Sequence, residues 1–186
     1  MNSYNNNKLN LSRRMIPYTP EECYRSYLAL YGIRDLFRKP AALSSAGSHI
    51  MQRYEEAWPV IGITGEAIDY ILSCGIESKK GTYRLSSVPK VQRAHLKNRV
   101  DTWVELMQFE HTLEQFWAVY TDADKTVLCL PKQNARINLI NYIPVPIGLF
   151  CSQGYRARVS HPEIEWLLSI KASSVNQHQA LDIQDE

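Results

Sequence analysis

The chain has 186 residues, of which 45% are hydrophobic and 22% are charged, and its formal net charge is +2. This length and composition allow one buried core and exclude a wholly disordered chain. Eight glycines, nine prolines and four cysteines exclude a collagen-like repeat and a disulfide scaffold. Because no two cysteines form a C-x-x-C pair, the sequence indicates neither a zinc ribbon nor a redox motif, and it favours a reducing, cytoplasmic location.

A polar leader precedes the first predicted helix. Residues 1–18 contain five asparagines and no continuous apolar run, so we expect a disordered leader without a secretory signal. Thr19 to Glu22 read Thr-Pro-Glu-Glu, a capping box that predicts a helix to about Lys39. The buried face of this helix is expected to hold Tyr24, Tyr27, Leu28 and Tyr31.

Two more helices, a hairpin and a long helix follow in the prediction. Apolar residues at helical spacing indicate helices over 48–58 and 64–74, the first of them after a loop at 44–47. The turn Ser78-Lys79-Lys80-Gly81 and the alternation from Thr82 to Leu85 predict a β-hairpin. The longest helix is predicted over 89–110, with three basic residues on one exposed face: Lys90, Arg93 and Lys97.

The second half is predicted to be mainly β-structure. Residues 116–130 are interpreted as a β-hairpin with Asp122 and Asp124 in its turn. Runs rich in β-branched and aromatic residues predict further strands over 136–143, 147–151 and 155–159. A capping box that begins at Ser160 predicts a last helix to Lys171, and a flexible tail is expected over 172–186.

These elements predict an α+β fold with an α-rich N-terminal part over 19–110, which includes the long central helix. A small antiparallel β-sheet, closed by the C-terminal helix, is predicted over 111–171. The uncharged run 137–155 has the length of a membrane span. Its asparagines, prolines and glycines would leave polar groups unsatisfied in lipid, so we expect no membrane partner.

Charge is segregated along the sequence. Residues 78–99 contain seven basic residues and no acidic residue, while the rest of the chain holds 14 basic and 19 acidic residues, a net charge of −5. A local excess of this kind attracts polyanions more strongly than the net charge suggests, although a solvated surface would show the same pattern. A nucleic-acid site is therefore predicted at Lys79, Lys80, Arg84, Lys90, Arg93 and Lys97.

Residues 48–85 resemble a winged helix-turn-helix DNA-binding domain, in which two helices are followed by a basic hairpin. The resemblance implies that the helix over 64–74 enters the major groove and that Lys79, Lys80 and Arg84 form wing contacts. That helix carries Glu66 and Asp69, whose charges are unfavourable beside phosphates, and it has no lysine or arginine.

The sequence thus favours a non-enzymatic DNA-binding transcriptional regulator or DNA-associated accessory factor that acts on double-stranded DNA without a cofactor or metal. The alternative is a protein-interaction adaptor, in which the uncharged run 137–155 and the tyrosine-bearing first helix contact a protein partner or a second copy of the chain. A third hypothesis is a metal-dependent nuclease that uses Asp69 and Glu77-Ser78-Lys79. The cysteines are expected to be buried, inert thiols rather than nucleophiles.

Overall fold

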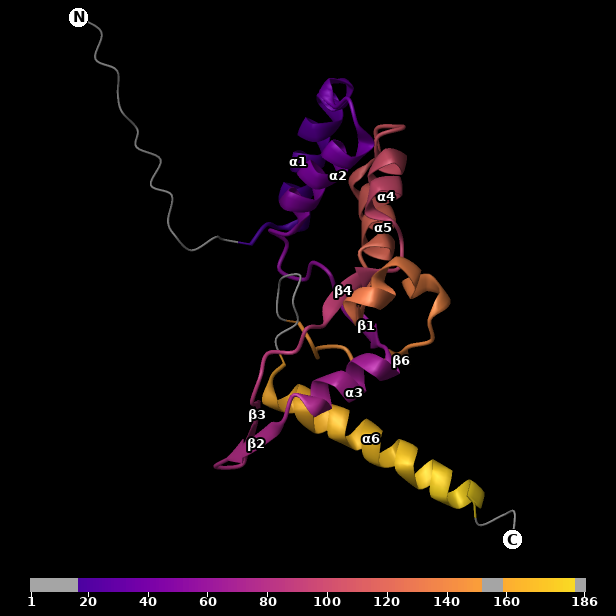
Figure 1. Cartoon of the computed structure of the whole chain (residues 1–186). Coiled ribbons are helices and arrows are strands. Elements are labelled where there is room, and N and C mark those ends of the chain that lie inside the picture. Colours follow the sequence, from indigo (N-terminus) through magenta and orange to yellow (C-terminus); the bar gives the residue numbers. More distant parts are fainter. Residues whose placement is uncertain (1–16, 152–158, 183–186) are drawn as a thin grey trace, which may run out of the picture.

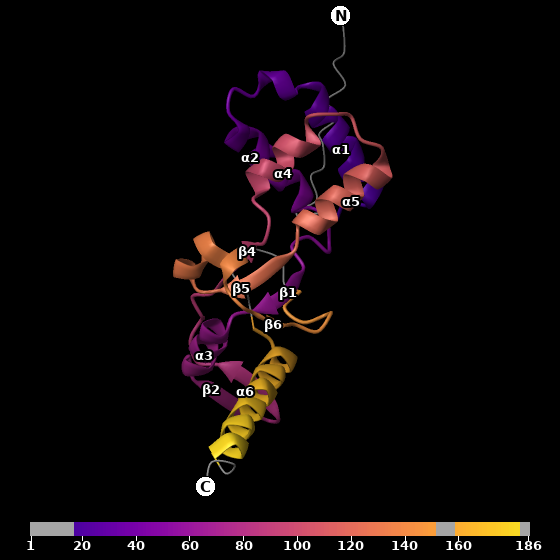
Figure 2. The ribbon, with the colours of Figure 1, turned by 90° about the vertical axis from the view of Figure 1, so that its right-hand side faces the viewer.

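The computed structural model describes residues 17–151 and 159–182 and has the predicted α+β class. Figures 1 and 2 show an elongated arrangement with a helical bundle at one end, a four-stranded sheet in the middle and a second layer of helix and hairpin at the other end. The bundle contains α1 (Pro20–Gly32), α2 (Pro40–Met51), α4 (Arg99–Leu106) and α5 (Leu113–Ala123), with the 3-10 turn η1 (Arg34–Leu36) after α1.

Local capping and an aromatic core hold the bundle together. Thr19 and Thr112 each begin a helix with a complete capping box, in which the third helical residue returns a hydrogen bond to the cap. The tyrosine row of α1 faces inward as predicted, and Tyr27 is fully buried against Phe116, with 4.7 Å between the ring centroids. The Tyr27 hydroxyl donates to backbone carbonyls at the end of α4, so this face of α1 belongs to the core.

Gly47 allows α2 and α4 to approach closely. A Cβ atom at this position would lie 2.2 Å from the ring of Trp103, which is 2% exposed. We expect Gly47→Ala to lower the free energy of unfolding by about 1–3 kcal/mol, since overpacking outweighs the higher helix propensity of alanine. Urea denaturation measures this loss. Gly32→Ala is the matched control, because nothing lies within 4 Å of its Cβ position, and an equal loss in both variants would contradict the proposed close packing.

The central sheet has the strand order β4-β5-β1-β6. Its strands are β1 (Val60–Ile63), β4 (Gln92–His95), β5 (Thr126–Cys129) and β6 (Ile143–Pro144). β1 and β5 run parallel, while the other two pairs are antiparallel, so the sheet is mixed rather than purely antiparallel. It also takes two of its strands from the part of the chain before residue 110. All four residues of β5 are buried, as expected for a central strand.

Helices cover both faces of this sheet. On one face, Leu128 of β5 packs with Ile68 of α3 (Gly65–Ser73) and Leu167 of α6 (His161–Asp182). On the opposite face, Val127 packs with Ile137 of the 3-10 segment η2 (Pro131–Leu139). The hairpin of β2 (Ile76–Lys79) and β3 (Thr82–Leu85) follows α3 and lies against α6.

Several predicted helix boundaries in the N-terminal half were wrong. The helix predicted over 48–58 is α2, which begins at Pro40 and contains the expected loop at 44–47. Ser44 and Gly47 are buried there, and Gly47 lies against Trp103 of α4, where only a small residue fits. The long helix over 89–110 is instead β4 followed by the short α4, because Asn98 caps a new helix by accepting from the Val100 N–H.

The second half also departs from its predicted elements. The hairpin predicted over 116–130 is α5 followed by β5, and Phe116, Tyr120 and Ala123 form a buried helical stripe. Residues 131–139 form η2 rather than a strand, and no strand is found over 147–151, whereas 155–158 lie outside the described residues. The last helix continues beyond Lys171 to Asp182, through most of the predicted tail. None of the helices in the described ranges is both long and apolar enough to cross a bilayer.

Candidate functional site

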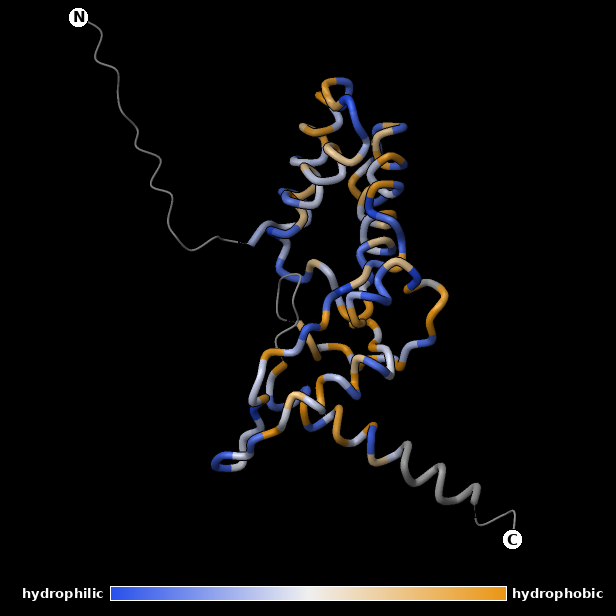
Figure 3. The backbone as a smooth tube through the Cα atoms, viewed as in Figure 1, coloured by the Kyte–Doolittle hydropathy of each residue, from blue (hydrophilic) through white to orange (hydrophobic). Residues whose placement is uncertain are grey.

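A basic hairpin, defined as residues 76–85, projects from the end of the molecule opposite the helical bundle (Figure 1). Lys80 and Gly81 form its two-residue turn with φ of 52° and 74°, and Lys79 pairs with Thr82 across the turn. Positive φ at both turn positions is the geometry of a type I′ turn, whose twist matches that of the two strands. The tip is strongly hydrophilic (Figure 3), and Lys79, Lys80 and Arg84 are exposed.

The charges of this hairpin are not neutralised within the described part of the chain. Glu77 lies opposite Arg84 in the strand register, but its carboxylate accepts a hydrogen bond of 2.9 Å from the Ser86 hydroxyl instead. Among the described residues, no salt bridge involves Lys79, Lys80 or Arg84. The hairpin therefore presents three cations and a single carboxylate to solvent.

The hairpin is anchored at its base by α6. The backbone N–H of Tyr83 donates to Nδ1 of His161 at 2.8 Å, and the two rings lie 5.1 Å apart. His161 also lies 3.4 Å from Glu165 through Nε2. Because this contact joins β3 to the first turn of a long helix, the basic side chains are carried by a supported element rather than by a free loop.

The carboxylates of α3 have cationic partners. Glu66 pairs with Lys132 at 2.9 Å, and Asp69 pairs with Lys171 at 2.6 Å. Both pairs are exposed and add little to stability, but they balance the acidic charge that the sequence placed on this helix. α3 precedes the hairpin directly, as in the predicted order. The strand β1 stands between α2 and α3, so these two helices are not joined by a short turn.

The other three predicted site residues do not share one face. Lys90 is exposed in the connection from β3 to β4. Lys97 is exposed but lies 2.5 Å from Asp122, and Lys97 and Lys125 together hold the pKa of that carboxyl at about 2. Arg93 is only 2% exposed and donates to two backbone carbonyls, so it does not project from an exposed helix face as predicted. The error arose because 89–95 is a buried strand and its approach, not the first turns of an exposed helix.

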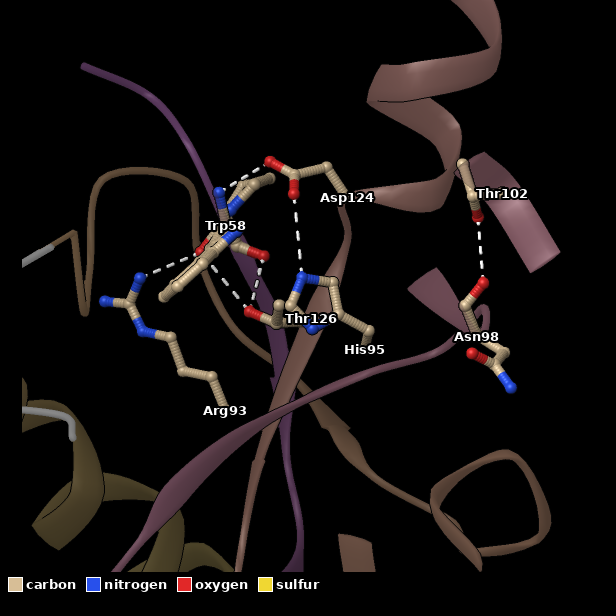
Figure 4. A network of polar contacts seen from close by, with 8 residues as sticks. Trp58, Arg93, His95, Asn98, Thr102, Asp124 and Thr126 are labelled. Carbon is tan, nitrogen blue, oxygen red and sulfur yellow. Dashed lines mark hydrogen bonds and ion pairs between the residues drawn. The ribbon is translucent and has the colours of Figure 1, made fainter. Parts of the chain in front are cut away.

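Arg93 crosslinks three separate segments from inside the protein (Figure 4). Its guanidinium donates to the carbonyl of Trp58 at 2.9 Å, the contact drawn in Figure 4. It also donates to the carbonyl of Phe150. Burial lowers the pKa of Arg93, and the charges of Cys151, Glu163 and Asp124 oppose that shift. Glu163, at the start of α6, accepts from the Phe150 N–H. Phe150 therefore bonds to Glu163 through its N–H and to Arg93 through its carbonyl.

Trp58 is held in an unusual backbone conformation beside Arg93. Its φ is 60°, which is rare for a bulky residue and costs about 1–3 kcal/mol. Three contacts fix it: its N–H donates to Asp124 Oδ2 at 2.6 Å, and its carbonyl accepts from Arg93 and from the Thr126 hydroxyl. Asp124 is 5% exposed, and its other oxygen lies 3.6 Å from Nε2 of His95 (Figure 4). Backbone strain that several hydrogen bonds maintain, as at Trp58, is common at functional sites.

A polar groove lies next to this network, between the bundle and the sheet. We call it the interlobe groove; its polar lining includes Ser44, His95, Lys97, Asn98, Arg99 and Asn134. A small cavity that reaches Trp58 and Asp124 shares His95 and Arg99 with it. His95, Asp124 and Trp58 were not among the site residues predicted from the sequence. Only Arg99 had a visible signal, as a member of the basic segment.

The enzyme hypotheses gain no support from the geometry. Cys23 and Cys129 are buried as expected, and burial raises the pKa of each to about 11, so both thiols stay protonated at neutral pH. The expectation of burial was wrong for Cys74, which is half-buried, and for Cys151, which is exposed. Asp69 and Glu77 each have a different partner, and residues 17–151 and 159–182 contain no cluster of three or more His, Cys, Asp or Glu side chains able to hold a metal. Asp122 and Asp124 lie at the end of α5, not in a hairpin turn.

Comparisons of the sequence with protein-family models and curated proteins, and of the fold with solved structures, found no match. Function therefore has to be inferred from the geometry and charge of the described residues.

Proposed function

We propose that this chain is a cytoplasmic, non-enzymatic DNA-binding regulator or accessory factor whose basic hairpin contacts the phosphate backbone of duplex DNA. The observation that carries the proposal is the exposure of Lys79, Lys80 and Arg84 on a projecting hairpin without an ion-pair partner in the described chain. Lys90 adds a fourth exposed cation shortly after the hairpin. Cations that are already free of protein partners lose no ion pair when they bind a phosphate.

The geometry suits contacts to the backbone more than to bases. A two-residue turn between two strands makes a narrow tip, and its lysines act as point charges that bind phosphate without reading sequence. The winged-helix interpretation adds that α3 approaches the duplex together with the hairpin. The lysine partners of Glu66 and Asp69 support this arrangement, since they offset the repulsion between α3 and DNA.

A salt titration tests the proposal. Fluorescence anisotropy with a generic duplex should show affinity that falls steeply with salt concentration. The triple variant Lys79→Ala, Lys80→Ala and Arg84→Ala is expected to reduce the slope of log K against log salt by about 2.7, since each phosphate contact contributes about 0.9.

The matched control removes the same charge from the opposite end of the molecule. Arg25, Arg38 and Lys39 are exposed in or after α1, and changing all three to alanine should leave the slope unchanged. If the control lowers the slope as much as the hairpin variant does, binding follows net charge and the hairpin is not the contact. If wild type does not bind even at low salt, the nucleic-acid proposal is wrong.

The adaptor remains a second candidate because of exposed apolar side chains on the uncharged segment. Leu139 is 80% exposed, and Ile147 is fully exposed. The tyrosine face of α1 is unavailable to a partner, since Tyr27 is buried in the bundle. An adaptor that uses this segment should self-associate, and Leu139→Ser with Ile147→Ser should abolish that association in sedimentation velocity. A wild-type chain that sediments as a monomer would count against it.

A further inference from the structure

We propose that the interlobe groove binds a small molecule through a phosphate group. This site is separate from the basic hairpin and does not depend on DNA binding. The groove has a volume of about 520 Å³, which is within the usual range for small-ligand sites. It is lined by elements from both halves of the molecule: α2, β4, the start of α4, and η2.

The charge of the lining favours an anion. Arg93, Lys97 and Arg99 line the groove, although Arg93 already donates to two backbone carbonyls, and no aspartate or glutamate lines it. The nearest N–H of α4 is already capped by Asn98, so the attraction comes from side chains and not from the helix terminus. Lys97 pairs at 2.5 Å with Asp122, which is not part of the lining, and this contact raises the pKa of the lysine. Because that pair offsets part of the charge of Lys97, Arg99 is the main cation open to a ligand.

Arg99 supplies a guanidinium group with free hydrogen-bonding capacity. It is partly buried and lies 5.6 Å over the ring of Trp58, yet within the described residues it makes no hydrogen bond or ion pair. A guanidinium group with no partner inside the protein can make a two-pronged contact with phosphate oxygens. The ring of Trp58, whose backbone is held by Asp124, lies at cation-π distance from this guanidinium.

His95 adds a further polar group at the inner end of the groove. Its Nε2 is buried and lies 3.6 Å from Asp124, beyond hydrogen-bond distance. The Asn98 and Asn134 amides and the buried Ser44 hydroxyl line the remainder, where they can bind the hydroxyl groups of a sugar. The groove thus combines the cations Lys97 and Arg99 with neutral polar side chains. This combination fits a sugar phosphate better than a ligand that carries charge at every polar group.

Isothermal titration calorimetry with three compounds tests the site: ribose 5-phosphate, inorganic phosphate and ribose. Ribose 5-phosphate should bind to the full-length chain, and ribose should not. If inorganic phosphate binds as tightly as the sugar phosphate, the phosphate alone is recognised; if it binds more weakly, the sugar contributes. Both results support the phosphate site.

Matched lysine variants make the test specific. Lys97 and Lys125 both pair with Asp122, but only Lys97 lines the groove. We expect Lys97→Gln and Arg99→Gln each to weaken binding by about tenfold, the effect of losing one charge-assisted hydrogen bond, and Lys125→Gln to leave it unchanged. Equal weakening in the Lys97 and Lys125 variants, or no binding of either phosphate compound at millimolar concentration, would overturn the proposal.

Discussion

Arg93→Met is expected to lower the free energy of unfolding by about 3–5 kcal/mol, because it removes one partner from a buried, charged hydrogen-bond network. The guanidinium of Arg93 joins the carbonyls of Trp58 and Phe150, which lie 35 and 57 residues away in the sequence. Methionine fills much of the same space but leaves both carbonyls without this donor. Urea denaturation monitored by tryptophan fluorescence measures the change.

Arg84→Met is the control for this prediction. It makes the same chemical change on the exposed hairpin, and it should alter stability by no more than about 0.5 kcal/mol. In DNA binding the order is reversed. Arg84→Met should weaken the affinity for duplex DNA, because it removes a phosphate contact, whereas Arg93→Met removes none. A stable Arg93 variant with weakened DNA binding would instead return Arg93 to the surface role that the sequence suggested.

Asp124→Ala is expected to cost about 2–4 kcal/mol, since it leaves the buried N–H of Trp58 without an acceptor and removes the carboxylate beside His95. The loss should be accompanied by a change in Trp58 fluorescence, because the φ of this residue depends on that hydrogen bond. Denaturation and emission spectra together report both effects.

The neighbouring carboxylate provides the comparison. Asp122 is on the same helix, but it is exposed and binds only exposed lysines, so Asp122→Ala should cost about 1 kcal/mol or less. If the two variants lose the same stability, the hydrogen bond from the buried Trp58 N–H to Asp124 contributes no more than an exposed ion pair.

Features that depend on neighbouring residues were predictable from the sequence. The capping box at Thr19 and the turn at Lys80-Gly81 both appear where the sequence indicated them. Their energies come from contacts within a few residues of the chain. The basic hairpin could be predicted from the sequence because its turn residues and the alternation in its second strand are also local features.

Features that depend on distant partners were not predictable. Gln92–His95 has no strong strand pattern of its own, and it becomes a strand because it pairs with Thr126–Cys129. The burial of Arg93 follows from that pairing and from two carbonyls far along the chain. The error at 116–123 was different: Thr112 and Gln115 form a local capping box, but the aromatic residues after it were interpreted as a strand.

The most direct test of the central claim is a two-dimensional amide NMR titration of the chain with a short duplex at low salt. Contact through the basic hairpin predicts shift changes concentrated at residues 76–86 and near Lys90, with smaller changes along the exposed face of α3. Changes confined to the bundle or to the interlobe groove, with the hairpin signals unmoved at saturating DNA, would contradict the proposed role of Lys79, Lys80 and Arg84.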